Sequence, residues 1–489
     1  MYIKLILYTS EEGRVIPKNR PSKERYHERL NGLIATLRHE IVEGTYPPES
    51  YLPSEIALSK RFSLSNKSLR KGLEVLEKEG YIRKIPRVGN QIVPLRPRAV
   101  IRFGCSQTIM RDLRMEDLIE EFHLLHPSIR VEVVPYVSVV PEITVGGEPL
   151  DVLSANVYQF LEIVRLGLTA QLEVLPEPED THPFLLEPFL HEGKLFVQPL
   201  GFAPIVLCYN KAHFAQSGVP EPDGSWSWDE LMMHATVLSN GAGRYGFGFH
   251  AMSENRWPIF MLQSGGRDEW EAPWDSESLR RKLMKNMKIC KDILHNRAMS
   301  PLYLSEDDKE ITKLFVDGKL SMILTNYAQM NDFLNADLEY DISPVPTQHD
   351  PATLLITIGA CICKDSPHKE EAHRFLRFMA SRHAQELIQS GTLTVPSYRP
   401  ILASPVASRV KRPGRYSLFR EIMFTFRTHK DLQFSDALRL KLLYLLKEYW
   451  ANLIGEEQLC DRMFQAIRED RNRDGNQVDA SKCFIGDRT

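Results

Sequence analysis

The sequence lacks any long apolar run, and this absence excludes membrane-spanning proteins. No stretch of about 18 consecutive apolar residues occurs in the 489 residues, so no transmembrane helix and no membrane partner are predicted. The N-terminal MYIKLILYTSEEGR has too short an apolar stretch and too little preceding charge for a secretion signal, and no A-x-A-like site follows it. We therefore expect a cytoplasmic protein.

Cysteine is scarce and does not form a paired set. The seven cysteines are scattered, and only Cys361 and Cys363 lie close together, inside an apolar run. An odd number at wide spacing favours reduced thiols in the cytosol over a disulfide framework. The 15 histidines show neither H-E-x-x-H nor a Cys/His metal spacing, so we predict no metal and no cofactor.

A uniform basic charge is also missing. The chain holds 61 Lys and Arg against 64 Asp and Glu, so no overall field attracts nucleic acid and such a partner would need a local patch. Residues 24–95 hold 12 basic and 9 acidic side chains, whereas residues 96–489 sum to a net charge of −9. A small basic head therefore precedes a large acidic body.

The length predicts several compact units, at about 150 residues per domain. We expect a tail over 1–23 that can be disordered, a head over 24–93, a linker over 94–99 and a body over 100–489. Two prolines in the linker remove backbone donors and favour an extended, stiff connector. Within the body we expect hinges near 195–210 and 325–350.

The head is predicted to contain three helices and a two-stranded ribbon. A 3.6-residue apolar stripe runs through the first helix until Gly44, and Ser54 caps a short second helix. Ser65 caps a longer third helix, whose leucines face inward. Four side chains of that helix are then predicted to face outward, namely Asn66, Lys67, Arg70 and Lys71. Residues 81–85 and 91–93 form the ribbon, so the head is an α+β helix-turn-helix with a wing.

The charges of this head fit double-stranded DNA. Lys67 to Arg87 contains 7 basic and 3 acidic residues. A helix with a basic outer face fits the major groove, and a basic hairpin reaches phosphate or the minor groove. The predicted DNA-binding residues are Ser54, Ser65, Asn66, Lys67, Arg70, Lys71, Arg83, Arg87 and Gly89.

The head resembles the GntR family of winged-helix transcription regulators. Leu52-Pro53-Ser54-Glu55 matches the family's L-P-S-E signature, and the resemblance continues from Ser65 to Gly80-Tyr81-Ile82. It implies an operator-binding protein that acts as a homodimer on two-fold half-sites. Asn66 stands where the family usually has Arg, and Arg87 where it usually has Gly. Because Asn prefers adenine and Arg prefers guanine, we expect a different operator sequence.

The body alternates strand and helix signals. Residues 99–105 and 130–136 have strand character, and 112–126 between them carry a helical stripe. This βαβ rhythm predicts a mostly parallel sheet with helices on both faces. The apolar run over 194–209 predicts strands that leave one lobe for another, and from Pro367 onward the signal is almost entirely helical.

The body resembles the family 1 extracellular solute-binding proteins, which are sugar receptors of ABC importers. The matching segments are 208–218, 225–231, 257–266, 315–322 and 449–455. The resemblance implies a two-lobed α/β, periplasmic-binding-protein-like domain that closes on a ligand. The complete prediction is a multidomain chain in which this domain follows the winged helix-turn-helix. A DNA-binding head in place of a secretion signal implies a receptor that senses inside the cell.

Sugar binding needs a flat apolar face for the ring and polar groups for the hydroxyls. Strand ends that face a cleft supply such groups. On this basis the predicted ligand-binding residues are Gln107, Asn156, Tyr209, Trp257, Asn326 and Tyr327. We assign Trp226 and Trp228 to packing around a helix start.

These observations predict a ligand-responsive transcription regulator that senses a sugar or oligosaccharide and has no enzymatic activity. Gly241-x-Gly243-x-x-Gly246 matches a dinucleotide motif, but it follows a helix and precedes a strand, which is the reverse order. Two alternatives stay open: a carbohydrate-active enzyme, and a sugar-binding module whose head serves only for oligomerisation. Turnover of oligosaccharide would favour the first, and the basic face of the third helix argues against the second.

Overall fold

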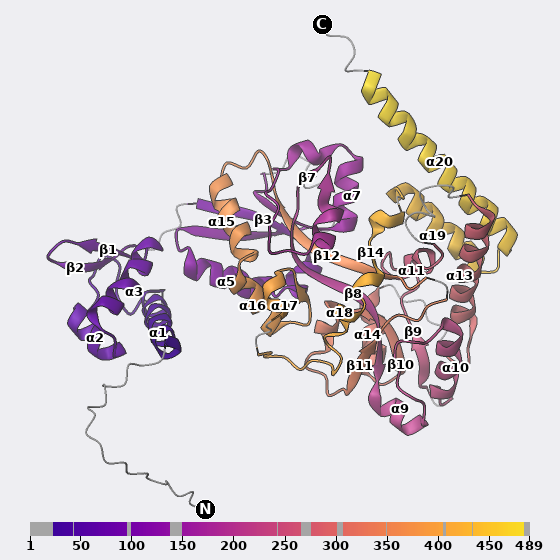
Figure 1. The fold of residues 1–489 in the computed structure, drawn as a ribbon, viewed down its shortest axis with the longest axis horizontal. Helices are drawn as coiled ribbons and strands as arrows, with labels where there is room; N and C mark the ends of the chain where they lie inside the picture. Colours follow the sequence, from indigo (N-terminus) through magenta and orange to yellow (C-terminus); the bar gives the residue numbers. More distant parts are fainter. Residues whose placement is uncertain are drawn as a thin grey trace, which may run out of the picture. The chain divides into compact units, whose positions relative to one another are not determined.

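The computed structural model describes residues 23–42, 44–94, 99–136, 149–241, 243–265, 275–300, 307–348, 350–403, 407–432 and 434–483 (Figure 1). Of 23–28, 436 and 473–483 it describes the backbone only. The chain divides into two compact units, Met1–Arg98 with Phe122–Arg130, and Ala99–Glu121 with Val131–Thr489. We call residues 23–94 the head and residues 99–483 the body. The predicted tail, apart from Lys23, and residues 95–98 of the predicted linker lie outside the described residues.

The head has the predicted order of elements. These are α1 (Lys23–Val42), α2 (Glu55–Phe62), α3 (Asn66–Lys78), β1 (Ile82–Ile85) and β2 (Gly89–Ile92). β1 and β2 form an antiparallel ribbon in which Ile82 pairs with Ile92 and Ile85 with Gly89. The winged helix-turn-helix prediction is therefore confirmed.

The core of the head forms where α1 packs on α3. Leu33 and Leu37 of α1 and Leu69 and Leu76 of α3 are completely buried. At Gly72 the two helices approach so closely that an added Cβ would lie 2.5 Å from Leu33 Cδ2. The three-helix core is thus specified by local apolar periodicity together with one small residue at the contact.

The body contains one continuous mixed sheet. Its strands follow the order β4-β3-β5-β12-β8-β10-β9, and β11 and β13 also pair with β8. The principal strands are β3 (Ala99–Cys105), β4 (Ile129–Pro135), β5 (Val152–Asn156), β8 (Gln198–Asn210), β9 (Tyr245–Gly248), β10 (Leu320–Asn326), β11 (Tyr340–Ser343) and β12 (Thr353–Ile362). Four strands have two residues each. β6 (Leu190–His191) pairs with β7 (Lys194–Leu195), β13 (Val395–Pro396) pairs with β8, and β14 (Phe426–Arg427) pairs with β12.

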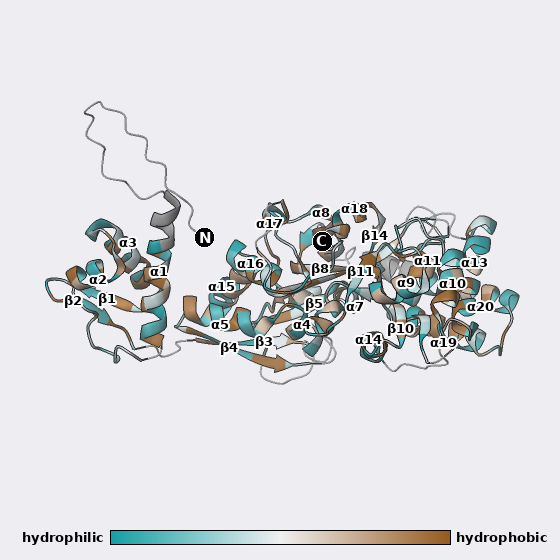
Figure 2. Ribbon diagram, turned by 90° about the horizontal axis from the view of Figure 1, so that it is seen from below, coloured by the Kyte–Doolittle hydropathy of each residue, from teal (hydrophilic) through white to brown (hydrophobic). Residues whose placement is uncertain are grey.

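Helices flank the sheet of the body, and many of them carry both teal and brown residues, as expected for elements with one buried side (Figure 2). Those of the first half are α4 (Gln107–Asp112), α5 (Met115–Leu125), α7 (Val157–Arg165), α8 (Pro183–Leu186), α9 (Lys211–Ser217), α10 (Trp228–Leu238) and α11 (Trp257–Leu262). Those of the second half are α13 (Glu277–His295), α14 (Asp308–Val316), α15 (Lys369–Met379), α16 (Arg382–Gly391), α17 (Arg399–Ala403), α18 (Leu418–Glu421), α19 (Asp436–Trp450) and α20 (Glu456–Cys483). Short 3₁₀ turns include η3 (Gln329–Phe333) and η5 (His429–Leu432).

Strand β8 belongs to two lobes at once. Residues 198–204 pair with β12, which also pairs with β5 of lobe one (β3, β4 and β5). Residues 205–209 pair with β10 of lobe two (β9, β10 and β11). All 13 residues of β8 are buried. The apolar run near 194–209 therefore does form a strand that passes from one lobe to the other, as predicted.

Alternate side chains of β8 enter different cores. Ile205, Leu207 and Tyr209 lie in one apolar cluster together with α10, α11, α13, α19 and α20. Val206 and Cys208 lie in the other cluster. Since successive side chains of a strand point to opposite faces, β8 is covered on both sides.

Three details of the body were predicted wrongly. β3–β5 and β9–β10 are parallel, but β8 is antiparallel to β10, β11, β12 and β13. The direction of a strand depends on its connections, which the alternation of apolar residues does not encode. The helix expected over 112–126 is divided by Arg114, whose φ is +49°. Beyond Pro367, β13 and β14 interrupt the helices; each has two residues, too few for a periodicity signal.

Candidate functional site

Two serines fix the starts of the helix-turn-helix elements. Ser54 Oγ accepts from the Ala57 amide at 3.2 Å at the start of α2, and Ser65 Oγ accepts from the Ser68 amide at 3.3 Å at the start of α3. Each bond satisfies one of the amide groups that have no partner in the first turn of a helix. Both predicted DNA-binding serines are exposed, and both serve as helix caps.

The two faces of α3 are separated as the periodicity predicted. Ser68, Leu69, Gly72, Leu73 and Leu76 are buried. The four side chains predicted to face outward are all exposed: Asn66, Lys67, Arg70 and Lys71. The helix thus presents one amide and three cations on one continuous surface, and these groups can donate to base edges and phosphates.

Arg70 has a partner that the sequence did not reveal. Its Nε donates to Glu55 Oε2 at 2.9 Å, while 60% of the Arg70 side chain stays exposed. Glu55 is the first residue of α2, so the pair joins the two helices at their exposed side. The guanidinium group is therefore oriented by one of its donors and keeps the remaining donors accessible.

The wing has an unusual residue at its turn. Arg87 lies between β1 and β2 with φ of +64°, a left-handed conformation that favours glycine. Gly89 follows with φ of +149°. Arg83 and Arg87 are exposed, and Arg83 Nη2 lies 3.4 Å from Gln91 Oε1. The wing turn keeps the backbone expected of a glycine but carries a cation.

In the body, the two predicted asparagines are the last residues of two strands that end at nearby positions along β8. Asn156 is the last residue of β5 and pairs with Ile358, which pairs in turn with Gly201 of β8. Asn326 is the last residue of β10 and pairs with Ile205. Both strands therefore end along the short stretch of β8 where the chain passes between lobes.

These asparagines also have local structural partners. Asn156 Oδ1 accepts from the Gln159 amide at 2.9 Å and completes a capping box at α7. Asn326 Oδ1 accepts from the Gln329 amide at 2.9 Å. Gln107 is the first residue of α4 and is exposed. Of the six predicted ligand residues, Gln107 is the one that the structure leaves exposed, and Asn156 is half-buried.

The predicted aromatic contacts are buried instead of exposed. Tyr327 is completely buried, and its hydroxyl donates to Tyr416 O at 2.9 Å and accepts from the Phe419 amide. Burial raises its pKa well above the usual value. The Tyr209 hydroxyl donates to Glu221 Oε2 at 2.8 Å, and its ring packs on Phe214. In this structure both rings complete apolar clusters.

Trp257 is only 1% exposed and starts α11 within the core of lobe two, so no open stacking platform is present there. Its Nε1 is buried and has no hydrogen-bond partner among the described residues. A buried N–H without an acceptor costs about 1–3 kcal/mol. By contrast, Trp228 Nε1 donates to Gln263, and Trp226 stacks on His234, which confirms the packing role predicted for both.

Arg256, immediately before Trp257, was not predicted. It is completely buried, donates to Gln329 Oε1 at 2.7 Å and to Leu324 O, and lies 3.2 Å from an Asp308 oxygen. It therefore connects the start of α11, the end of β10 and η3, which are the segments that carry Trp257 and Asn326. No periodicity identifies such a residue, because its partners Asp308, Leu324 and Gln329 are 52 to 73 positions away.

The lobes also contact each other directly through α4 and η3. Arg111 donates to Asp332 at 2.9 Å, and Asn331 donates to Asp112 O. Asp112 is buried beside Arg111, and burial raises its pKa to about 6 against the opposing effect of that guanidinium group. These contacts join the helix that begins with Gln107 to the turn that follows Asn326.

A second contact between the lobes involves Tyr158 of α7. The Arg439 guanidinium lies 4.2 Å from the centre of its ring, and His429 meets it edge-on at 5.9 Å. His429 Nε2 donates to Glu254 O at 2.9 Å. Burial, with a smaller contribution from Arg439, lowers the pKa of His429 to about 4.

Two further features are absent from the described part of the chain. It contains no cluster of three or more His, Cys, Asp or Glu side chains that could hold a metal ion. No helix among the described residues is long and apolar enough to span a membrane.

The Gly246 of the glycine motif packs against α10, where an added Cβ would lie 1.8 Å from Ala235 O. The described residues of the motif follow α10 and lead into β9, which is the reverse of the strand-to-helix order of a phosphate loop.

The comparisons match the two parts to different proteins. Residues 31–92 match the gntR family of bacterial regulatory proteins. The HTH-type transcriptional regulator YieP of Escherichia coli is 32% identical over 62 residues, which are 13% of this chain and 27% of the relative. Rv0494 of Mycobacterium tuberculosis is 31% identical over 100 residues, 20% of this chain and 39% of the relative. The chain thus spans well under half of these relatives.

Residues 117–409 match the bacterial extracellular solute-binding proteins. The substrate-binding protein Lmo0181 of Listeria monocytogenes, solved with cycloalternan, has a TM-score of 0.63 at 18% identity over 76% of this chain and 99% of that one. Maltose-bound MalE3 of T. maritima has a TM-score of 0.66 at 17% identity over 76% and 99%. The fold is therefore that of a two-lobed solute-binding protein. The chain belongs to the bacterial extracellular solute-binding protein family and carries an N-terminal DNA-binding region of the gntR family.

Proposed function

We propose that this protein is a transcription regulator whose affinity for operator DNA changes when its body binds a sugar or oligosaccharide. The observation that carries the proposal is the presence of both parts in one chain: a helix α3 with an exposed cationic face, and a two-lobed solute-binding fold. Neither matched family is a family of enzymes, and the proposal needs no chemical step. A regulator that binds the DNA of its cell acts in the cytoplasm, and we propose this location for the protein.

The proposed DNA contacts are those of α3 and the wing. Asn66 and Arg70 read bases in the major groove, and Lys67 and Lys71 contact phosphates. Arg83 and Arg87 extend the contact through the wing. Ser54, Ser65 and Gly89 act by setting the backbone of these elements, and the two serines can also donate to phosphate. Two copies bind one two-fold operator, since half-site spacing requires two recognition helices.

The proposed ligand site lies where β5 and β10 end beside β8. Asn156, Asn326 and Gln107 offer amides to sugar hydroxyls. Trp257 offers its buried N–H, and an acceptor oxygen of the ligand would satisfy it. Tyr209 and Tyr327 support the site from within the flanking clusters. Three structural neighbours were solved with maltose, maltotetraose or acarbose, so these compounds are the first candidates.

Lobe closure is the proposed link between the two binding events. The hinge segments are 195–210 and 325–350, which include β8 and the η3 contact with α4. A ligand changes operator affinity only by its differential affinity for the two states, typically about 1–3 kcal/mol. Linkage then requires operator DNA to change sugar affinity by the same factor.

The test has two stages. Maltose, maltotetraose, acarbose and tagatose are first screened by thermal unfolding, because a ligand at 100 times its Kd adds about 2.7 kcal/mol of stability. Operator sequences are selected from random DNA, and the ligand found is then titrated by calorimetry with and without saturating operator. A 5- to 150-fold difference is expected. Identical dissociation constants would reduce the protein to two independent binding domains.

A further inference from the structure

One short segment of the body concentrates positive charge, although the body as a whole is acidic. Residues 409–420 include no acidic residue and five basic ones, Arg409, Lys411, Arg412, Arg415 and Arg420. Residues 96–489 sum to a net charge of −9, so this segment reverses the sign of the charge locally. Arg409, Lys411 and Arg420 are exposed, and Arg412 and Arg415 are half-buried. We call residues 409–420 the basic segment.

Backbone hydrogen bonds fix the basic segment against α16 and lobe two. The Arg409 amide donates to Ser390 O in the last turn of α16 at 2.8 Å. The Arg415 amide donates to Asp341 Oδ1 of β11, also at 2.8 Å. Because the backbone is held at both places, the segment has little conformational freedom to lose when it binds a partner. Its cations are therefore already in position.

The side chains of the basic segment meet carbonyl oxygens. The donors and their main-chain acceptors are Arg412 with Gln389 O, Arg420 with Leu402 O and Lys411 with Leu338 O. Of the five cations, Arg415 is the one that approaches a carboxylate, with Nη2 3.7 Å from Glu421. The other four form no ion pair with the described residues. Since a carbonyl group has no net charge, their positive charges stay uncompensated.

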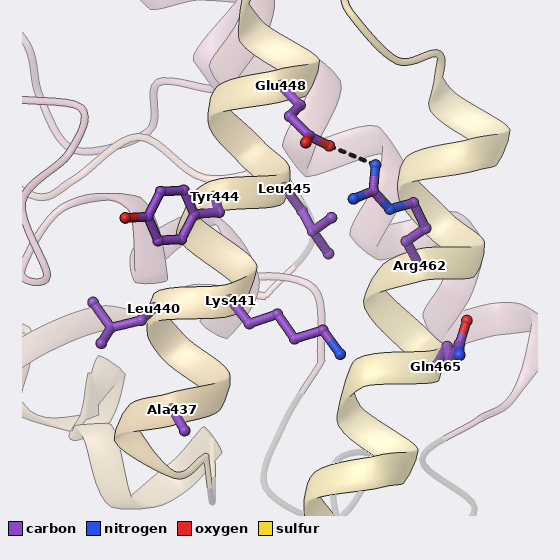
Figure 3. Close-up of a pocket in the computed structure, with 8 residues that line it drawn as sticks. All are labelled: Ala437, Leu440, Lys441, Tyr444, Leu445, Glu448, Arg462 and Gln465. Atoms are coloured by element: carbon purple, nitrogen blue, oxygen red, sulfur yellow. Dashed lines mark hydrogen bonds and ion pairs between the residues drawn. The ribbon is translucent and has the colours of Figure 1, made fainter.

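Exposed cations elsewhere in the body show the opposite arrangement. Figure 3 shows Arg462 of α20 paired with Glu448 of α19. Two other cations are also paired with carboxylates: Lys441 of α19 with Glu469 at 2.8 Å, and Lys288 of α13 with Asp292 at 3.0 Å. The charges of these helices are balanced within the protein, whereas those of the basic segment are left for a partner.

We infer that the basic segment is a second DNA-contacting surface, on which Arg409, Lys411 and Arg420 bind phosphates of the duplex backbone. Local clusters of uncompensated cations attract the backbone whatever the base sequence, and arginine can bind phosphate through two parallel hydrogen bonds. Arg412 positions the segment, because its guanidinium holds the end of α16 and lies 4.2 Å from the centre of the Tyr416 ring. The inference rests on the proposed function, which brings duplex DNA to this chain. It adds a contact made by the body.

The test measures binding of the full-length protein to a duplex of random sequence, by fluorescence anisotropy at several salt concentrations. The triple variant Arg409→Ala/Lys411→Ala/Arg420→Ala removes three phosphate contacts. Each contact contributes about 0.9 to the slope of log affinity against log salt, so the slope should become shallower by about 2.7. The affinity at low salt should fall on the order of tenfold or more. Arg409→Lys/Arg420→Lys retains both charges and should keep most of the slope.

The matched control is Lys288→Ala/Lys441→Ala/Arg462→Ala. It removes the same net charge, but from cations that have carboxylate partners, and it should leave the slope unchanged. Lys67→Ala/Lys71→Ala changes the phosphate contacts proposed for α3 and should make the slope shallower by about 1.8. Far-UV circular dichroism with thermal unfolding verifies that every variant is folded.

The outcomes separate the inference from the proposed function. A triple variant with the wild-type slope, beside a weakened α3 variant, would overturn the inference and leave the proposed function intact. A wild-type chain that binds no duplex, or an α3 variant without effect, would overturn the DNA contacts of the proposed function. Equal losses in the triple variant and its control would reduce the effect to net charge and overturn the inference. Binding of a polyglutamate peptide that the triple variant loses, with duplex binding retained, would assign the segment to an acidic protein instead.

Discussion

The head and the body use polar residues in different ways. In the head, charged side chains stand on the outside of α3, and the residues behind them are apolar and local in sequence. In the body, most predicted ligand residues are buried or cap a helix, and charged groups such as Arg256 and Arg439 lie almost completely inside. A surface that meets a polyanion can be built from one helix, whereas a site between lobes requires buried polar groups whose partners come from distant segments.

Trp257 gives the largest expected effect and separates packing from binding in the body. Trp257→Ala should lower the free energy of unfolding by about 3–5 kcal/mol, because a buried aromatic ring leaves a cavity in lobe two. Trp257→Phe retains most of the volume and removes the N–H, so it should cost much less stability but should weaken sugar binding. Denaturant unfolding and calorimetry measure the two effects. Unchanged sugar affinity in Trp257→Phe would assign the residue to the core alone.

Arg70 tests the head in the same way, with function expected to change and stability to remain. Arg70→Ala should weaken operator binding by about 1–3 kcal/mol if the guanidinium reads a base, and should change the free energy of unfolding little, since the side chain is exposed. Fluorescence anisotropy at several salt concentrations measures the effect. A loss that is equal for all sequences, with a salt slope smaller by about one, would make Arg70 a phosphate contact.

The buried His429 gives the body a dependence on pH. Its folded-state pKa, about 4, lies below the unfolded value near 6.5, so the unfolded chain binds more protons between these two values. Stability should therefore fall as the pH decreases through this window, by about 2 kcal/mol between pH 7 and pH 5 from this group. Denaturant midpoints of the body should show this slope, and His429→Gln should reduce it. An equal slope in the variant would assign the effect to other groups.

The contact between Glu55 and Arg70 should give the smallest effect. Glu55→Gln removes the charge of the partner that orients the guanidinium, and exposed pairs contribute about 1 kcal/mol or less. We expect a loss of operator affinity within that limit, together with relaxed sequence preference, because the base-reading geometry is less restricted. Glu55→Asp, which retains a carboxylate, should recover part of the preference. If Gln and Asp variants both select the wild-type operator, the pair serves only to hold α2 against α3.

The same contrast explains what could be predicted from the sequence. The order of elements in the head followed from local signals, namely two serine caps, one leucine stripe and two short strands. In the body, the passage of β8 between lobes was visible as an apolar run, but its antiparallel pairing was not, because strand direction depends on connections that hydrophobic periodicity does not encode. Arg256 and Tyr158 were missed for a related reason. Their partners lie in segments that only the folded sheet brings together.

The shared strands also determine the order in which the body can be completed during synthesis. Lobe one begins with β3 near residue 99, yet β12, which closes its sheet beside β5, ends at Ile362. After β5 ends at Asn156, the ribosome needs on the order of 10–40 seconds to reach Ile362 at about 5–20 residues per second. Throughout that time β5 presents an unpaired edge, which is a template for aggregation. The head is complete by Ile92 and can fold at once, so a chain paused within lobe two already carries a finished winged helix beside a lobe that still awaits its last strand.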